Sequence, residues 1–236
     1  VALIFTVHPL QTESVTYITQ RTELLAGVFF LFTLYAAVRA WEASRPGLWS
    51  CAAVVSCALG MASKEVMVAA PLTVLLYDWV FTRVPMRGLL RRRAWLYVGL
   101  AATWTILAAL LWGAPHSKTI GFGLGISALD YLRTQAGVIL HYFRLVLWPD
   151  PLVLSYDWPM AHTWSDCLPQ FVIVAALGVA TVYGVLRRSW VGFLGAWCFL
   201  ILAPTSSFVP ITTEVAAERR MYLPLAAVTC LLVMGG

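Results

Sequence analysis

Long apolar runs, separated by short charged connections, are the feature that most constrains this chain. Of its 236 residues, 61% are hydrophobic and only 11% are Asp, Glu, Lys or Arg. Several runs approach the length of about 20 residues that a helix needs to cross the hydrocarbon core of a bilayer. Because lipid offers no hydrogen bonds to the backbone, such runs predict helices. We therefore expect an all-α, polytopic membrane helical bundle.

Charge sorting orients this bundle. Nine of the sixteen cations fall at connections such as Arg83–Arg93 and Arg187-Arg188, which the positive-inside bias assigns to the cytoplasm. The opposite side, called the outer face below, then receives nine of eleven acids, all four histidines and both lysines. Topology explains the net charge of +5, so nucleic acid is not indicated as a partner. Any chemistry is expected on the outer face.

Seven full crossings and a partial first one are predicted. The partial span covers residues 1–7, and the full spans cover 24–41, 48–62, 66–82, 94–112, 169–186, 189–204 and 221–236. Residues 131–148 are also helical in pattern, with a polar stripe formed by Asp130, Arg133, Gly137, His141 and Arg144. We favour an amphipathic helix in the outer interface. The alternative is a true span whose polar stripe lines a cavity.

The cysteines and the chain ends say little about chemistry. Cys167 alone is predicted on the outer face, so no disulfide or zinc spacing exists. No ligand set demands a metal. The chain begins without Met and ends inside an apolar run, and we expect it to be part of a larger protein.

Three outer segments carry the candidate site residues. In the first, His8 and Glu13 are followed by Arg21 and Glu23, and one helical face would align Glu13 with Glu23. Such a group could bind a polar substrate or handle a proton, or it could be a solvated interfacial helix start. In the second, Lys64 could receive a phosphate or snorkel to the interface. Because Lys64 and Glu65 are adjacent, they would not face each other on a helix.

The third segment is the densest. Glu214, Glu218 and Tyr222 are four residues apart, so a helix would align them, and Arg219 and Arg220 point elsewhere. Arginines on the outer face oppose the positive-inside bias, whereas an anionic headgroup explains them through bidentate phosphate contacts. Tyr156-Asp157-Trp158 could form a sugar-stacking platform, although we favour an aromatic belt.

Several motifs in this order resemble a known family. They are His8-Pro9-x-x-Thr12-Glu13, Arg21-x-Glu23, Ser63-Lys64-Glu65, Tyr156-Asp157-Trp158 and Glu218-Arg219-Arg220-Met221-Tyr222. Together they resemble the membrane part of the transmembrane and tetratricopeptide-repeat proteins, which belong to the GT-C class of lipid-dependent glycosyltransferases. The resemblance makes residues 1–236 a partial GT-C-like transmembrane domain. It implies that the first outer loop, with the main catalytic acid, precedes Val1 and that tetratricopeptide repeats follow Gly236.

The resemblance also implies an activity. A sugar, typically mannose, would move from a polyprenyl-phosphate carrier to a protein or glycan hydroxyl acceptor, on the periplasmic face of a bacterial inner membrane. The catalytic candidates are Glu13, Glu218 and His8, and the phosphate-binding candidates are Arg219, Arg220 and Lys64. Arg21, Glu23, Tyr222 and Asp157 complete the expected site. A divalent metal is compatible with the class. The rival function is a transporter or flippase, which would need polar groups deep in the spans.

Overall fold

The computed structural model describes residues 1–82, 84–113, 127–206 and 214–235, and every regular element in these ranges is a helix. The α-helices are α1 (Ala2–Val7), α2 (Thr12–Thr16), α3 (Arg21–Glu42), α4 (Pro46–Ser63), α5 (Ala69–Phe81), α6 (Met86–Arg92), α7 (Ala94–Gly113), α8 (Ala128–Leu147), α9 (Trp164–Leu186), α10 (Trp190–Leu202) and α11 (Tyr222–Gly235). Four 3₁₀ turns are η1 (Pro9–Gln11), η2 (Ile18–Gln20), η3 (Glu65–Val68) and η4 (Glu218–Met221).

Within the described residues, four helical segments are long and apolar enough to cross a membrane. They are Ile18–Glu42, Pro46–Ser63, Ala94–Trp112 and Trp164–Leu186. The expected all-α membrane bundle is therefore confirmed. The other predicted spans, 66–82, 189–204 and 221–236, correspond to α5, α10 and α11, which have 13, 13 and 14 residues. Helices of this length cover only about 20 Å, so their crossing stays a prediction.

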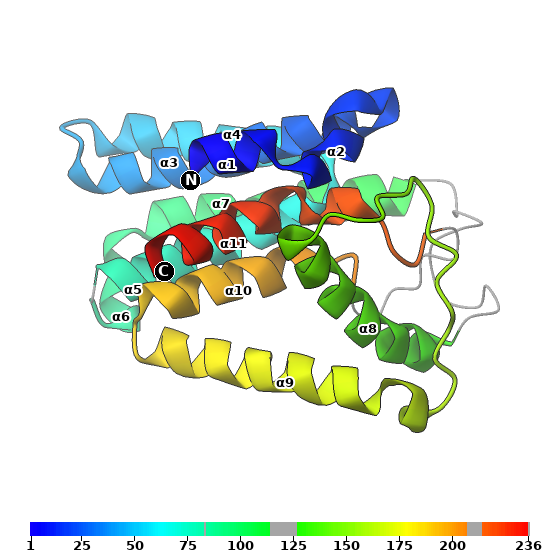
Figure 1. Ribbon diagram of the computed structural model, residues 1–236. Coiled ribbons are helices and arrows are strands. Elements are labelled where there is room, and N and C mark those ends of the chain that lie inside the picture. Colours follow the sequence, from blue (N-terminus) through cyan, green and yellow to red (C-terminus); the bar gives the residue numbers. More distant parts are fainter. Residues whose placement is uncertain (83, 114–126, 207–213, 236) are drawn as a thin grey trace.

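The long helices run side by side, and their connections gather at two ends (Figure 1). One end holds the α3–α4 turn, the α9–α10 turn and α6, which forms within the Arg-rich 83–93 connection. The opposite end holds α2, η4 and the start of α8. The acidic and histidine-rich segments therefore share the end away from the arginine-rich turns, as the charge sorting predicts.

Two apolar cores hold the bundle together. The larger core joins α3, α4, α5, α7 and α10, with Phe30, Met61, Leu100 and Trp197 among its buried side chains. The smaller core joins α8 to the chain around η4, and Tyr142, Met221 and Leu225 are fully buried in it. This second core positions the outer segments described below.

Helix α9 lies at the edge of the bundle and buries only Cys167 along its length. It is held to α10 by a close backbone approach, because a Cβ on Gly192 would lie 2.2 Å from the carbonyl carbon of Gly184. Small residues commonly let membrane helices pack this closely. The remaining apolar faces of α9 are exposed, which suits contact with lipid.

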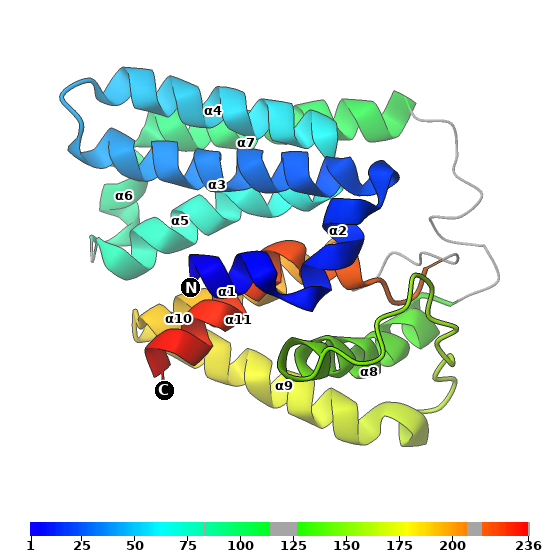
Figure 2. The same ribbon diagram turned by 45° about the horizontal axis from the view of Figure 1, so that its top comes forward.

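Helix α8 runs obliquely to the long helices in both views (Figures 1 and 2). Its apolar side packs into the smaller core. Its polar stripe is covered by the segment 156–162, since Trp158 and Tyr156 contact the His141 ring and Arg133 binds the His162 carbonyl. The part of the polar stripe around Arg133 and His141 therefore faces protein, whereas Arg144 is exposed, and the depth of α8 in the membrane stays a prediction.

Candidate functional site

Glu13 and Arg219 meet at the outer end, although 206 residues separate them in the chain. Glu13 Oε1 accepts a hydrogen bond from Arg219 Nη1 at 2.7 Å, and Oε2 accepts one from the Arg219 backbone N–H at 2.9 Å. Glu13 is only 7% exposed. The carboxylate thus holds both the guanidinium and the backbone of Arg219. The first and third outer segments converge, as their charges predict.

Arg219 also has a second carboxylate partner. Its Nη2 pairs with Glu214, whose side chain is 39% exposed, whereas that of Glu13 is 4% exposed. An exposed ion pair contributes little to stability. The two acids on Arg219 therefore differ in kind, because one is buried and fixed and the other lies at the rim, where an incoming anion could replace it.

A second ion pair lies beside the first. Lys64 follows the end of α4 in extended conformation and binds Glu23, which lies in the first turn of α3. Lys64 thus pairs across the bundle and not with its neighbour Glu65. Both residues line a cavity that Arg219, Arg220 and Thr205 also reach. The cavity has a volume of ≈ 20 Å³, which is room for about one water molecule. In this paired state the site is closed.

Arg220 has a different role from Arg219. Its side chain is buried, and its two terminal nitrogens donate to the carbonyls of Val215 at 3.0 Å and Glu214 at 2.6 Å. Arg220 therefore lies inside its loop and not at the rim beside Glu214. The guanidinium instead takes up backbone acceptors of its own loop and fixes that loop's shape.

The helical alignments expected for both acidic segments are wrong. Tyr17 is extended and separates α2 from η2, so Glu13 and Glu23 do not share one helix. Ala217 is extended before η4, so Glu214 and Glu218 do not either. Side chains explain the second break, because Tyr142 Oη accepts from the Ala217 N–H and Arg220 occupies two carbonyls. Backbone groups satisfied in this way no longer favour a helix.

Glu218 is buried against the segment that follows α8. Its Oε1 accepts hydrogen bonds from Tyr156 Oη at 2.6 Å and from the Val153 N–H at 2.7 Å. Burial raises the pKa of the Glu218 carboxyl, and these hydrogen bonds offset only part of the rise. Among the described residues Oε2 has no hydrogen-bond partner. Glu218 thus keeps one oxygen available.

His8 is fully engaged by backbone groups. Its Nδ1 accepts from the Leu10 N–H at 3.2 Å, and Nε2 therefore carries the hydrogen that it donates to the Val146 carbonyl at 2.9 Å. This geometry ties the start of the chain to α8. Neither ring nitrogen is left to exchange a proton with a substrate.

The remaining expected site residues divide into packed and exposed ones. Tyr222 packs edge-on against Phe5 and approaches Gly27 of α3, so it is part of the helix packing. Arg21 and Asp157 are exposed, and each lacks a hydrogen bond or ion pair within the described part of the chain. The structure does not bring these two into the cluster.

Two contributors were not assigned roles from the sequence. Glu214 lay in the acidic segment, but nothing distinguished it from its neighbours, and Tyr156 was interpreted as part of a belt. Tyr156 comes within hydrogen-bond distance of Glu218 only because η4 and the 153–158 segment pack together, and no spacing in the sequence indicates this. Among the described residues, no three His, Cys, Asp or Glu side chains are close enough to hold a metal ion.

Comparison with known proteins gives one distant relative. The chain is 28% identical over 186 residues to Protein O-mannosyl-transferase Tmtc2 of Drosophila melanogaster, a match that covers 71% of this chain. The chain spans 18% of the length of that protein. No protein-family model matches, and no solved structure matches. The chain is thus distantly similar to one part of a larger protein, and four of its described helical segments are long and apolar enough to cross a membrane.

Proposed function

We propose that this protein moves a mannosyl group from a polyprenyl-phosphate carrier to a protein or glycan hydroxyl, on the non-cytoplasmic side of the membrane. The observation that carries the proposal is the Glu13–Arg219 pair, which joins two distant charged segments at the outer end of an apolar bundle. Similarity to a protein O-mannosyl-transferase supports the choice of sugar and reaction. A bacterial inner membrane remains our proposed location.

The leaving phosphate needs a cation that stays in place as negative charge develops. Arg219 fits this need because Glu13 fixes its backbone and its Nη1, while the rim residue Glu214 occupies Nη2. A phosphate oxygen that replaced Glu214 would meet a guanidinium already in position. Such preorganised charge is usually a large contribution to catalysis. Lys64 lies in the same cavity lining and is the second candidate cation.

The acceptor hydroxyl needs a base. Of the three candidates, Glu13 has both oxygens bound to Arg219 and His8 has both nitrogens bound to backbone. Glu218 has a free oxygen and a raised pKa, which moves it toward the neutral range where a general base works best. In this mechanism Glu218 takes the proton of the acceptor hydroxyl while the hydroxyl oxygen attacks the anomeric carbon of the mannosyl group. The bond from that carbon to the phosphate oxygen breaks, and the phosphate leaves with the electron pair.

The decisive experiment replaces Arg219 by Lys and measures mannosyl transfer from a polyprenyl-phosphate mannose. A lysine keeps the charge but cannot reproduce the forked contacts of arginine. We expect turnover to fall about tenfold or more, equivalent to ~1.4 kcal/mol of transition-state stabilisation. Arg21→Lys is the matched control, since Arg21 is exposed at the same end, and it should keep normal turnover.

A second variant tests how the site opens. Glu214→Gln removes the rim carboxylate from Nη2 and leaves the Glu13 contacts in place. If phosphate and Glu214 compete, the KM for the carrier should fall in this variant. Normal turnover in Arg219→Lys, together with an unchanged KM in Glu214→Gln, would contradict phosphate binding by Arg219 and make Lys64 the next candidate.

A further inference from the structure

A second outer cavity lies between α8 and the start of α9, apart from the Glu13–Arg219 and Lys64–Glu23 ion pairs. We call it the α8–α9 pocket. Its volume is ≈ 340 Å³, at the lower end of the range of about 300–1,000 Å³ that is typical of small-molecule sites. Its polar and aromatic lining comes mainly from Arg133, Thr134, Trp158, Met160, Asp166 and Gln170.

Within the part of the chain that the structure describes, two buried polar atoms in this lining have no hydrogen-bond partner. They are Arg133 Nε, a donor, and Gln170 Oε1, an acceptor. Leaving such a group unpaired costs about 1–3 kcal/mol, and a site near lipid offers few alternatives. Both atoms have almost no accessible surface, so a ligand hydroxyl, which both donates and accepts hydrogen bonds, would satisfy them once the two side chains turn toward the pocket.

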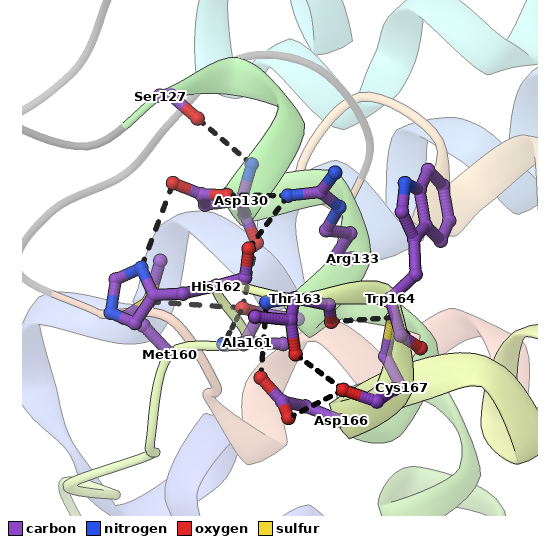
Figure 3. A network of polar contacts seen from close by, with 12 residues as sticks. Ser127, Asp130, Arg133, Met160, Ala161, His162, Thr163, Trp164, Asp166 and Cys167 are labelled. Carbon is purple, nitrogen blue, oxygen red and sulfur yellow. Dashed lines mark hydrogen bonds and ion pairs between the residues drawn. The ribbon is translucent and has the colours of Figure 1, made fainter.

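The charges around the pocket are already compensated. Arg133 Nη1 donates to Asp130 at 3.0 Å and to the His162 carbonyl at 2.8 Å, and its guanidinium lies 4.6 Å from the Trp164 ring centre (Figure 3). Hydrogen bonding to Ser127, and secondarily to Arg133, lowers the pKa of Asp130, so this acid stays ionised at neutral pH. Asp166 is held by Thr163 in a capping box. These pairings favour a neutral ligand over a phosphate.

The pocket also has an apolar, flat wall. Trp158 lies beside Gly137, where an added Cβ would be 3.5 Å from the indole, and Pro159 and Met160 continue the surface. Aromatic rings with a few placed polar groups are suited to the C–H faces and hydroxyls of a pyranose. We propose that the α8–α9 pocket binds a neutral sugar ring, an inference that rests on the proposed glycosyl transfer.

Ring contacts join this pocket to the candidate base. Trp158 contacts His141 with ring centres 5.0 Å apart, His141 contacts Tyr156 at 5.1 Å, and Tyr156 donates to Glu218 at 2.6 Å. The same short segment thus lines the sugar pocket and holds Glu218. Two rings separate the pocket from Glu218, which does not line it, so a sugar bound there would be a part of the acceptor away from the hydroxyl that reacts.

The test measures binding of methyl α-mannopyranoside to the protein in lipid nanodiscs by saturation-transfer-difference NMR. Gly137→Leu should fill the pocket, and Gln170→Leu should remove the unpaired acceptor. We expect the sugar signal to fall at least fivefold in both variants. The thermal midpoint of Gln170→Leu should stay the same or rise, because an unsatisfied buried group is lost. Gly178→Leu is the matched control, since a Cβ there meets nothing within 4 Å, and it should keep the signal.

Other outcomes overturn the inference. It fails if the unaltered protein gives no sugar signal, if both variants keep the full signal, or if a neutral threonine peptide binds in a Gln170-dependent way and the sugar does not. Mannosyl transfer is measured in parallel on the same samples. Transfer without pocket-dependent sugar binding refutes only the pocket, whereas pocket-dependent binding without transfer refutes only the proposed reaction.

Discussion

The two ends of the bundle use carboxylates and arginines in contrasting ways. At the inner end, Asp78 is fully buried and accepts hydrogen bonds from Thr82, Arg93 and Tyr97. Arg93 in turn lies 4.3 Å from the ring centre of Trp41. One acid is thus surrounded by donors, and the cluster links α5 to α7.

At the outer end the same residue types are less completely paired. Arg219 is shared by two acids, one of them at the rim, and one oxygen of Glu218 has no hydrogen-bond partner among the described residues. The comparison teaches that pairing alone does not indicate function. A saturated, buried pair is expected to support the fold, whereas an arginine with one exposed partner at the rim, as Arg219 has in Glu214, is able to exchange that partner.

The largest effect should come from breaking the inner cluster. Asp78→Ala would leave Arg93 and Tyr97 without their buried acceptor, and losing one partner of a buried pair costs about 3–5 kcal/mol. We expect a steep loss of folded protein, measured by thermal unfolding in nanodiscs. Asp157→Ala is the control, since exposed residues of this kind usually change stability by less than about 0.5 kcal/mol. A near-normal midpoint for Asp78→Ala would remove the contrast between the two ends.

An intermediate effect is expected for Arg220, the structural arginine of the outer end. Arg220→Lys keeps the charge but cannot reach both carbonyls of Glu214 and Val215 together. We expect a loss of about 1–3 kcal/mol in unfolding free energy, read as a lower thermal midpoint. Arg219→Lys should lower turnover more than stability. Comparing the two lysine variants therefore separates the structural role of Arg220 from the catalytic role of Arg219. The assignment is wrong if Arg220→Lys keeps its midpoint but loses turnover.

The smallest effect concerns the pH dependence of Glu218. Because burial raises its pKa, the folded protein binds more protons than the unfolded chain between the ordinary value of 4.5 and the raised one. The raised pKa of Glu218 therefore contributes to the stability of the folded protein at low pH. This stabilisation is lost as pH rises through the folded-state pKa. Glu218→Gln should abolish this component, so the thermal midpoint of the variant should fall less than that of the unaltered protein as pH rises. An identical pH profile in both proteins would show that Glu218 is not perturbed.

Much of the architecture could be predicted because its causes are local. Apolar runs predict helices, and arginine placement predicts which ends lie together. The meeting of Glu13 with Arg219 was also foreseeable, since each carried charge that its own segment did not need. These features depend on composition and on simple topology.

The details of the site could not be predicted, because they depend on contacts between distant segments. A four-residue spacing suggested a helix through Glu214 and Glu218, but Tyr142 and Arg220 satisfy that backbone from outside. The burial of Arg220 depends on the same fold of the loop. The α8–α9 pocket depends on how 158–161 lies over α8, which no local pattern in the sequence specifies.

The distance along the chain between Glu13 and Arg219 also bears on biosynthesis. Glu13 leaves the ribosome before its partner, which follows 206 residues later. During insertion, the acid must remain on the outer side without this partner until the segment before α11 arrives. The outer site therefore cannot form until the segment before α11 has been synthesised, and formation of the Glu13–Arg219 pair reports that the intervening helices have been inserted with the correct orientation.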